Sequence, residues 1–258
     1  MSKQSYRAGT MNKTASILNI QINNISSDEL LHSLNDGLLV TPNIDILMHL
    51  QEDEQLHSII QDADFVTCDS MLLSVYYKLL FHRHLEVIRG SNFLPQFYNY
   101  HKTNSEITIF LFGSTGQTAQ MAMKNINTKI QRNIVVGAVS PSMDINDAEN
   151  KHIIQQINQS KATVLVVGLG CPKQEKWITN HKAELTHVRI FMALGATIDF
   201  EAGVKKRAPK WLQEHCLEWF YRLVQEPHRL AKRYLAYDMP IFYLLLKQRL
   251  ELYKNPFR

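Results

Sequence analysis

The stretch Val164-Leu-Val-Val-Gly-Leu-Gly-Cys-Pro-Lys-Gln-Glu-Lys-Trp177 decides the fold class of this chain. It opens with a short continuous apolar run, Val164–Leu169, which is typical of a strand that is buried on both faces of a sheet. A glycine-rich turn follows, and a helical pattern begins at Pro172. A buried strand that turns directly into a helix is the repeating unit of a parallel α/β sheet.

The same alternation of strand and helix continues on both sides of this stretch. Apolar runs predict further strands at Leu38–Thr41, Phe65–Thr67, Ile107–Phe112, Ile134–Val139 and Ile190–Leu194. Helical periodicity predicts helices at Asp45–Gln61, Ser70–Leu80, Asn92–His101, Gln117–Ile130, Asp147–Asn158 and Pro172–His181. We therefore expect an α/β fold with a mainly parallel sheet and helices on both faces, and a strand at Ile17–Ile22 that pairs at an edge.

The pattern changes after Phe200, where the strands stop. Pro209 suits the first turn of a helix, which we expect to continue to Tyr234 with a break or kink at Pro227. A second helix is expected from Pro240 to about Tyr253. The chain thus divides into a sheet domain, residues 1–202, and a helical appendage, residues 203–258.

Composition places the chain among ordinary soluble domains, with 258 residues, 45% hydrophobic and 20% charged. Its three cysteines form no Cys-x-x-Cys pair, so we expect no disulfide framework, no zinc site and a reducing cytoplasm. Residues 1–19 lack the apolar segment of a secretory signal. No run approaches the roughly 18 apolar residues of a membrane span.

The positive charge is concentrated in the appendage. Residues 203–258 hold 12 Lys and Arg against 5 Asp and Glu, a balance of +7, whereas the whole chain carries +4. Such a tail indicates a phospholipid, a phosphorylated substrate or a nucleic acid as partner. We do not expect nucleic acid, because the sheet domain has no matching basic excess.

Polar residues follow the predicted strands where each one ends. These segments are Thr41-Pro-Asn43, Cys68-Asp69-Ser70, Gly113-Ser-Thr-Gly116, Gly170-Cys-Pro-Lys-Gln-Glu175 and Gly195-Ala-Thr-Ile-Asp199. Strand ends of a parallel sheet open on one rim, so a single cleft is expected there. The glycines either let a phosphate approach a helix N-terminus or form plain turns. The chain has neither a full dinucleotide fingerprint nor a P-loop.

Several of these segments resemble, in the same order, the blocks of the WecG/TagA/CpsF family of bacterial glycosyltransferases (glycosyltransferase family 26). The matching blocks are Thr41-Pro-Asn43, Arg89-Gly-Ser-Asn92, Pro172-Lys-Gln-Glu-Lys-Trp177, Arg207-Ala-Pro209 and Leu217-Glu-Trp-Phe-Tyr-Arg-Leu-Val-Gln-Glu-Pro-His-Arg229. Two positions depart from the family pattern: Ser70 stands where the family usually has glycine, and Asn92 where an acidic residue is common.

The resemblance implies a Rossmann-like fold and an inverting, metal-independent transfer without a cofactor. The donor would be a UDP-sugar carrying N-acetylmannosamine, its uronic acid or glucose. The acceptor would be an undecaprenyl-diphosphate-linked saccharide at the inner face of the cell membrane. The alternative is a nucleotide- or polyanion-binding module without catalysis. A homo-oligomer is compatible with either interpretation.

Matching positions imply the catalytic group. Asp69 would be the general base that takes the acceptor proton, unless it only caps the helix beginning at Ser70. Thr41 and Asn43 would orient a substrate, unless Pro-Asn merely forms a turn. Arg89 would offset charge on the leaving diphosphate, and a surface salt bridge is its alternative.

The remaining implied residues form two groups. The resemblance implies that the donor is bound by Gly113, Gly168, Gly170, Gln174 and Glu175. The alternative for Gln174 and Glu175 is that they are ordinary residues of a helix N-terminus.

The resemblance implies that the acceptor and the membrane are bound by Arg207, Arg222, Arg229, Lys232 and Arg233. The alternative is that these residues form a solvated basic face on a helix packed against the domain. Asp62-Ala-Asp64 resembles a metal-binding Asp-x-Asp, but it precedes its strand, so we expect a solvated loop on the wrong rim.

Overall fold

A six-stranded parallel sheet forms the centre of the computed structural model, which describes residues 13–257 apart from the side chains of Lys210, Glu214 and Arg229. Its strands are β3 (Gly37–Val40), β4 (Phe65–Val66), β5 (Ile109–Gly113), β6 (Val135–Val139), β7 (Val164–Gly168) and β8 (Ile190–Ala193). They are arranged in the order β4-β3-β8-β7-β5-β6, and every neighbouring pair is parallel. All six carboxyl ends therefore share one rim.

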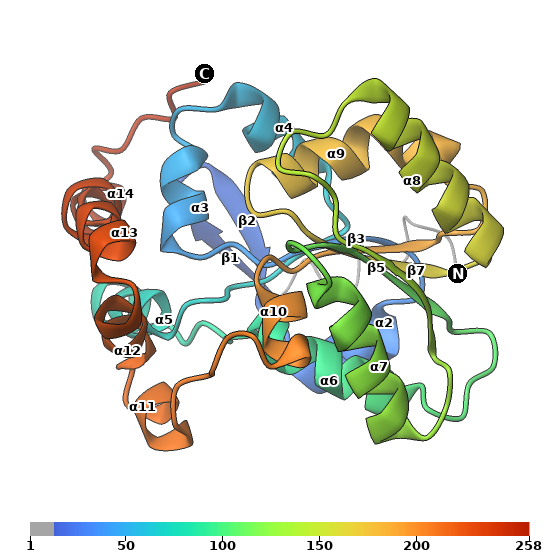
Figure 1. Ribbon diagram of the computed structural model, residues 1–258. Coiled ribbons are helices and arrows are strands. Elements are labelled where there is room, and N and C mark those ends of the chain that lie inside the picture. Colours follow the sequence, from blue (N-terminus) through green and yellow to red (C-terminus); the bar gives the residue numbers. More distant parts are fainter. Residues whose placement is uncertain (1–12, 258) are drawn as a thin grey trace.

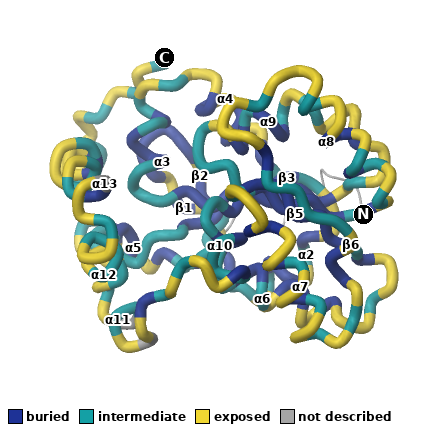
Figure 2. The backbone as a smooth tube through the Cα atoms, in the orientation of Figure 1, coloured by how far each residue is buried: buried dark blue, intermediate teal, exposed yellow. Residues whose placement is uncertain are grey.

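Alternating side chains of each strand supply two hydrophobic layers, as in β7, where Leu165 and Val167 enter one layer and Val164 and Val166 the other. The first layer also receives α3 (Ile44–His49), α4 (Glu54–Asp62), α5 (Met71–Phe81), α8 (Asp147–Ser160) and α9 (Lys173–His181). The second receives α2 (Ser27–Ser33), α6 (Gly90–Tyr100), α7 (Thr118–Ile130) and α10 (Thr197–Ala202). Helices thus cover both faces of the sheet (Figure 1), and the strands are the most deeply buried part (Figure 2). The expected Rossmann-like architecture is confirmed.

Glycines let the carboxyl ends of the central strands approach closely. A Cβ added to Gly113 would lie 2.5 Å from the carbonyl carbon of Gly168, and one added to Gly168 would lie 2.6 Å from the oxygen of Gly195. Real Cβ atoms do not approach backbone so closely, so any side chain here would push the strand ends apart. These glycines shape the rim before any ligand is considered.

Two predicted elements are wrong in detail. The single edge strand Ile17–Ile22 is instead a hairpin of β1 (Thr14–Ile17) and β2 (Ile20–Asn23), outside the main sheet. The side chain of Asn19 anchors its turn by donating to the carbonyl of Leu50 at 2.7 Å. The hairpin forms in place of a single edge strand because its two short strands satisfy each other's backbone hydrogen bonds while its isoleucines stay buried.

The predicted helix Asp45–Gln61 is also divided. It splits into α3 and α4, because Asp53 caps a new helix by accepting a hydrogen bond from the Leu56 N–H at 2.9 Å.

The C-terminal part forms a series of short helices along one side of the sheet domain, drawn in orange and red in Figure 1. They are α11 (Lys210–Glu214), α12 (Glu218–Gln225), α13 (Pro227–Lys232), a π-helical segment η3 (Arg233–Asp238) and α14 (Pro240–Arg249). The predicted break near Pro227 coincides with the start of α13. None of the helices within residues 13–257 is long and apolar enough to cross a membrane.

The last of these helices, α14, is anchored in the core. Ile241 and Leu245 are fully buried in the same hydrophobic layer as α3 and α5. Gln248 accepts a hydrogen bond from the Leu18 N–H at 2.8 Å and donates to the Ser16 carbonyl at 3.1 Å, which ties α14 to the hairpin. The C-terminal helices are therefore fixed to the body at their far end.

Candidate active site

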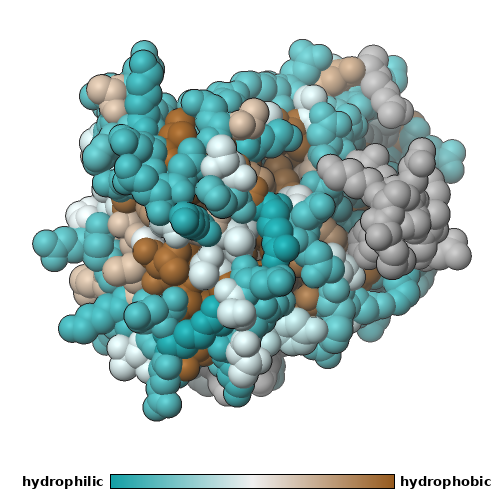
Figure 3. Space-filling model, turned by 90° about the vertical axis from the view of Figure 1, so that its right-hand side faces the viewer, coloured by the Kyte–Doolittle hydropathy of each residue, from teal (hydrophilic) through white to brown (hydrophobic). Residues whose placement is uncertain are grey.

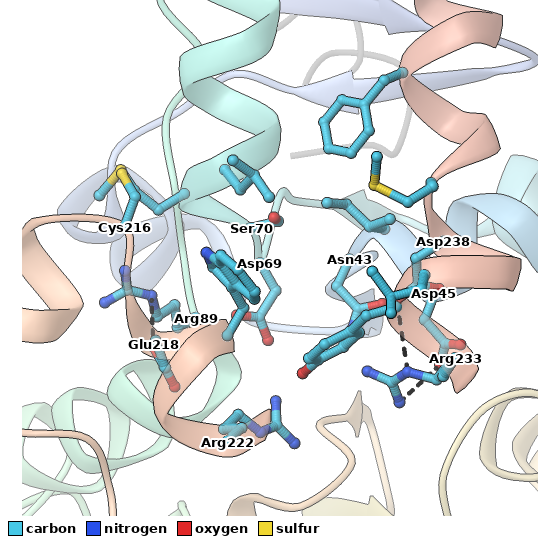
Figure 4. Close-up of a pocket in the computed structure, with 18 residues that line it drawn as sticks. Asn43, Asp45, Asp69, Ser70, Arg89, Cys216, Glu218, Arg222, Arg233 and Asp238 are labelled. Carbon is cyan, nitrogen blue, oxygen red and sulfur yellow. Dashed lines mark ion pairs between the residues drawn. The ribbon is translucent and has the colours of Figure 1, made fainter. Parts of the chain in front are cut away.

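A cavity of about 270 Å³ lies between the strand ends and the C-terminal helices (Figure 4). The sheet domain contributes Asn43, Ile44, Asp45, Asp69, Ser70, Met71, Leu72 and Arg89. The C-terminal helices contribute Cys216, Glu218, Trp219, Arg222, Arg233, Tyr234, Leu235, Asp238, Met239 and Phe242. The cavity is thus complete only when both parts of the chain are in place.

The carboxyl group of Asp69 lies inside this cavity, just beyond the end of β4. The Asp69 N–H donates to the Pro42 carbonyl at 2.9 Å, and its Oδ2 accepts a hydrogen bond from the Gly90 N–H at 3.4 Å. Burial raises the pKa of Asp69 to about 7, and the negative charge of Glu218 raises it further. The hydrogen bond from the Gly90 N–H and the positive charges of Arg222 and Arg89 oppose this shift. A carboxyl group with a pKa near neutrality can accept a proton from a hydroxyl under physiological conditions.

The sequence left open whether Asp69 only caps α5, and in the structure the cap of α5 is Ser70. Its hydroxyl accepts a hydrogen bond from the Leu73 N–H at 3.2 Å, so Asp69 is not needed to begin the helix. Ser70 also has an extended backbone, with φ at −128°. Serine therefore stands without strain where the family usually has glycine.

Arg89 joins the sheet domain to the C-terminal helices. Its side chain is only 11% exposed, and its Nε lies 3.5 Å from Oε2 of Glu218. A second nitrogen donates to the Gln213 carbonyl at 3.1 Å. Glu218 was not identified as a site residue from the sequence, although it stands in the Leu217-Glu-Trp219 block of the family pattern. Its ion-pair partner, Arg89, lies far away in the sequence, so the contact could not be predicted.

Two arginines from the C-terminal helices lie around the cavity in Figure 4, but they differ in charge balance. Arg233 lies 3.4 Å from Asp45 and 3.5 Å from Asp238, so its charge is largely compensated. Arg222 forms no ion pair with any described residue. The guanidinium of Arg222 is thus available to an anion that enters the cavity.

Asp238 shares the cavity and is buried, and its Oδ1 has no hydrogen-bond partner among the described residues. Burial raises the pKa of Asp238 to about 6, although the adjacent Arg233 opposes the shift.

The other predicted basic residues lie outside the cavity lining. Arg207 donates to Gln213 Oε1 at 3.2 Å and to the Ser91 carbonyl at 3.4 Å, which braces the start of the C-terminal segment. Lys232 is exposed to solvent. The side chain of Arg229 is outside the described part of the structure.

The predicted donor residues lie along the ends of β5, β7 and β8. Gln174 and Glu175 are both buried; Gln174 accepts a hydrogen bond from the Gly195 N–H at 3.1 Å and donates to Glu175 at 2.8 Å. Burial raises the pKa of Glu175. Gly170 has a left-handed φ of +81° with open space beside its Cα. These residues hold the rim together, and the space beside Gly170 adjoins the N-terminus of α9.

Thr41 and Asn43 follow β3, as predicted, but only Asn43 lines the cavity. Thr41 is buried. Asn43 caps α3 by accepting a hydrogen bond from the Ile46 N–H at 3.0 Å, so its turn role and its position in the site coexist.

Neither of the remaining polar features forms part of this cavity. Asp64 accepts a hydrogen bond from the Leu38 N–H at 2.9 Å, at the opposite rim from Asp69. Asn92 lies in the first turn of α6 and is absent from the cavity lining. Within residues 13–257, no group of three or more His, Cys, Asp or Glu side chains is placed to hold a metal ion.

Comparison with known proteins gives one family. The family model described as "Glycosyl transferase WecG/TagA/CpsF family" matches residues 15–255. The chain is 26% identical over 217 residues to the N-acetylglucosaminyldiphosphoundecaprenol N-acetyl-beta-D-mannosaminyltransferase of Staphylococcus aureus strain MRSA252, covering 81% of this chain and 79% of that relative. It is 25% identical over 214 residues to the protein of the same name from strain MW2, with the same coverage. The family match includes the sheet, the cavity and the C-terminal helices.

Proposed function

Because the chain belongs to the WecG/TagA/CpsF family of glycosyl transferases, we propose that it transfers N-acetylmannosamine from a UDP-sugar to an N-acetylglucosaminyl-diphosphoundecaprenol acceptor. The names of the relatives support this sugar over its uronic acid or glucose, and they support this acceptor. The family resemblance and the glycine-lined strand ends support UDP as the carrier in this proposal.

The observation that carries the proposal is a carboxyl group of raised pKa, Asp69, in one cavity with the guanidinium of Arg222, which has no ion-pair partner among the described residues. In the proposed reaction Asp69 takes the proton of the acceptor hydroxyl while that oxygen attacks the anomeric carbon of the donor. The bond from the anomeric carbon to the UDP oxygen breaks on the opposite face, so the configuration inverts. UDP leaves with the bonding electron pair, and Asp69 afterwards releases its proton to solvent.

The proposal assigns charge compensation to arginine. Arg222 would face the diphosphate of the acceptor, because a planar guanidinium binds phosphate oxygens in pairs and is always charged. Arg89 is already bonded to Gln213 and Glu218, so we assign it the task of holding the C-terminal helices beside Asp69. We propose that the transfer is metal-independent because the family resemblance implies it.

The proposed location is the inner surface of the cell membrane, with the C-terminal helices as the contact. Large apolar side chains are exposed on them, including Trp211, Trp219, Phe220, Val224 and Leu246. Aromatic and basic residues together suit the interface of an anionic bilayer. The coloured part of the face turned toward the viewer in Figure 3 is largely hydrophilic, with a group of apolar residues near its centre.

The proposal is tested by mass analysis of an acceptor with a shortened lipid chain after incubation with UDP-N-acetylmannosamine, UDP-N-acetylglucosamine and UDP-glucose. We expect a gain of one N-acetylhexosamine with the first donor alone, unaffected by a metal chelator. A gain only with another donor would correct the sugar. No gain with any donor would overturn the proposed activity.

A further inference from the structure

The cavity that contains Asp69 has a hydrocarbon wall for which the transfer chemistry gives no reason. Met71 and Leu72 come from the first turn of α5, and Leu235, Met239 and Phe242 come from η3 and the start of α14. Figure 4 shows labelled charged groups on several sides of the cavity, with Arg89 on the left, Arg222 below and Arg233 on the right, so the cavity offers charged groups as well as this hydrocarbon wall. A substrate that fills the whole cavity must therefore be amphiphilic.

The two helices that supply this wall are fixed to each other. The hydroxyl of Tyr76 on α5 donates to the Phe242 carbonyl on α14 at 3.1 Å, and the rings of the same two residues lie 4.9 Å apart, edge to face. Ile241 and Leu245 are fully buried beneath them. The wall is thus held in shape by the core and does not depend on a ligand to form it.

Apolar side chains continue from the cavity to the surface on both helices. On α5, Leu72 is followed by Val75 and Leu79, which are 51% and 68% exposed. On the C-terminal side, Met239 is followed by Tyr243 and Leu246, at helical spacing and also exposed. Residues three, four and seven apart lie on one helix face, so each helix carries an apolar stripe that begins in the cavity.

We propose that this wall is a binding site for the first isoprene units of the acceptor's polyprenyl chain, whose diphosphate lies against Arg222. The inference rests on the proposed function for the identity of the lipid. The physical basis of the inference is chemical complementarity. A polyprenyl diphosphate has an anionic head and a hydrocarbon chain, and the cavity offers the guanidinium of Arg222 to the head and the hydrocarbon wall to the chain. The exposed stripes then lead the chain toward the bilayer.

Binding of prenyl diphosphates of increasing length, measured by calorimetry without vesicles and below the micelle concentration, tests the site without any transfer reaction. The series is inorganic diphosphate, then dimethylallyl, geranyl and farnesyl diphosphate. We expect the dissociation constant to fall about tenfold with each added isoprene unit until the wall is filled, the fold-change for burying about two methylene groups.

Four variants separate the possible outcomes. Leu72→Gln and Leu235→Gln should remove most of the length dependence, and Leu235 is 72% exposed, so its replacement does not threaten folding. Met143→Gln is the matched control, since Met143 is an exposed apolar residue outside the cavity and outside the C-terminal helices, and it should keep the wild-type dependence. Arg222→Gln should weaken all diphosphates alike.

The inference fails if farnesyl diphosphate binds no better than inorganic diphosphate, or if Leu72→Gln and Leu235→Gln both keep the full length dependence. Transfer of sugar to the acceptor with a shortened lipid chain is measured separately by mass, so neither binding result decides whether the protein transfers sugar. Failure of the lipid site and failure of the proposed activity are therefore distinguishable.

Discussion

Replacement of Asp69 by asparagine should abolish transfer and at the same time stabilise the fold at alkaline pH. The carboxyl group is held in a cavity that favours its neutral form, and its pKa rises from the ordinary 3.8 to about 7. In the unfolded chain the group ionises at the ordinary value. Between these two values the unfolded state releases its proton first, so the native state loses stability relative to the unfolded state as the pH rises.

The magnitude follows from the two pKa values. Each unit of pKa difference corresponds to roughly 1.4 kcal/mol, so Asp69 costs the fold about 2 kcal/mol at pH 5 and about 4 kcal/mol at pH 8. Asparagine has nearly the same shape and carries no charge. The stability gained by Asp69→Asn should therefore grow by about 2 kcal/mol between pH 5 and pH 8.

Urea unfolding of the wild type and Asp69→Asn at several pH values measures this difference, and transfer by both proteins is followed at pH 8. A stability difference that stays constant with pH would refute the raised pKa. A variant that is less stable than the wild type at pH 8 would show that the ionised Asp69 stabilises the fold through Arg222 and Arg89.

Three further predictions concern the contacts around the site. Glu218→Gln should move the acidic limb of the pH profile of kcat/KM below its wild-type midpoint near pH 7, because the negative charge that helps to raise the pKa of Asp69 is lost. Glu106→Gln is an exposed control at the opposite rim and should leave this profile unchanged. An equal shift in both variants would contradict a local effect of Glu218 on Asp69. Gly113→Ala should destabilise the fold by about 2 kcal/mol or more in urea unfolding, because its Cβ would collide with Gly168; an unchanged midpoint would argue against the tight rim. Ile241→Ala should cost about 3 kcal/mol, because it leaves a cavity beneath α14, and limited proteolysis should then cut the C-terminal helices sooner; equal cleavage rates would mean that the core does not anchor them.

The sheet could be predicted from the sequence because its strands are buried on both faces, which leaves continuous apolar runs such as Val164–Leu169. The hairpin at the N-terminus could not, since its turn at Leu18 and Asn19 contains no glycine or proline, and Leu18 adopts a φ of 51°. Tertiary contacts of Asn19, rather than local preference, hold that turn.

The candidate site was predictable where a residue stands directly after a strand, as Asp69 and Asn43 do. It was not predictable where the decisive partner lies far along the chain. Charge alone could not show that Arg233 is compensated by Asp45 and Asp238, while Arg222 has no ion pair within the described part of the chain. The Arg89–Glu218 contact likewise depends on how the C-terminal helices pack against the body.

The most direct test of the central claim is to measure UDP binding and sugar transfer in parallel for the wild type and Asp69→Asn. A catalytic base predicts that the variant binds UDP as the wild type does while its transfer to the lipid-diphosphate acceptor falls by several orders of magnitude. Transfer that persists in Asp69→Asn at a rate close to that of the wild type would contradict the account. UDP binding in both proteins with transfer in neither would favour a binding module without catalysis.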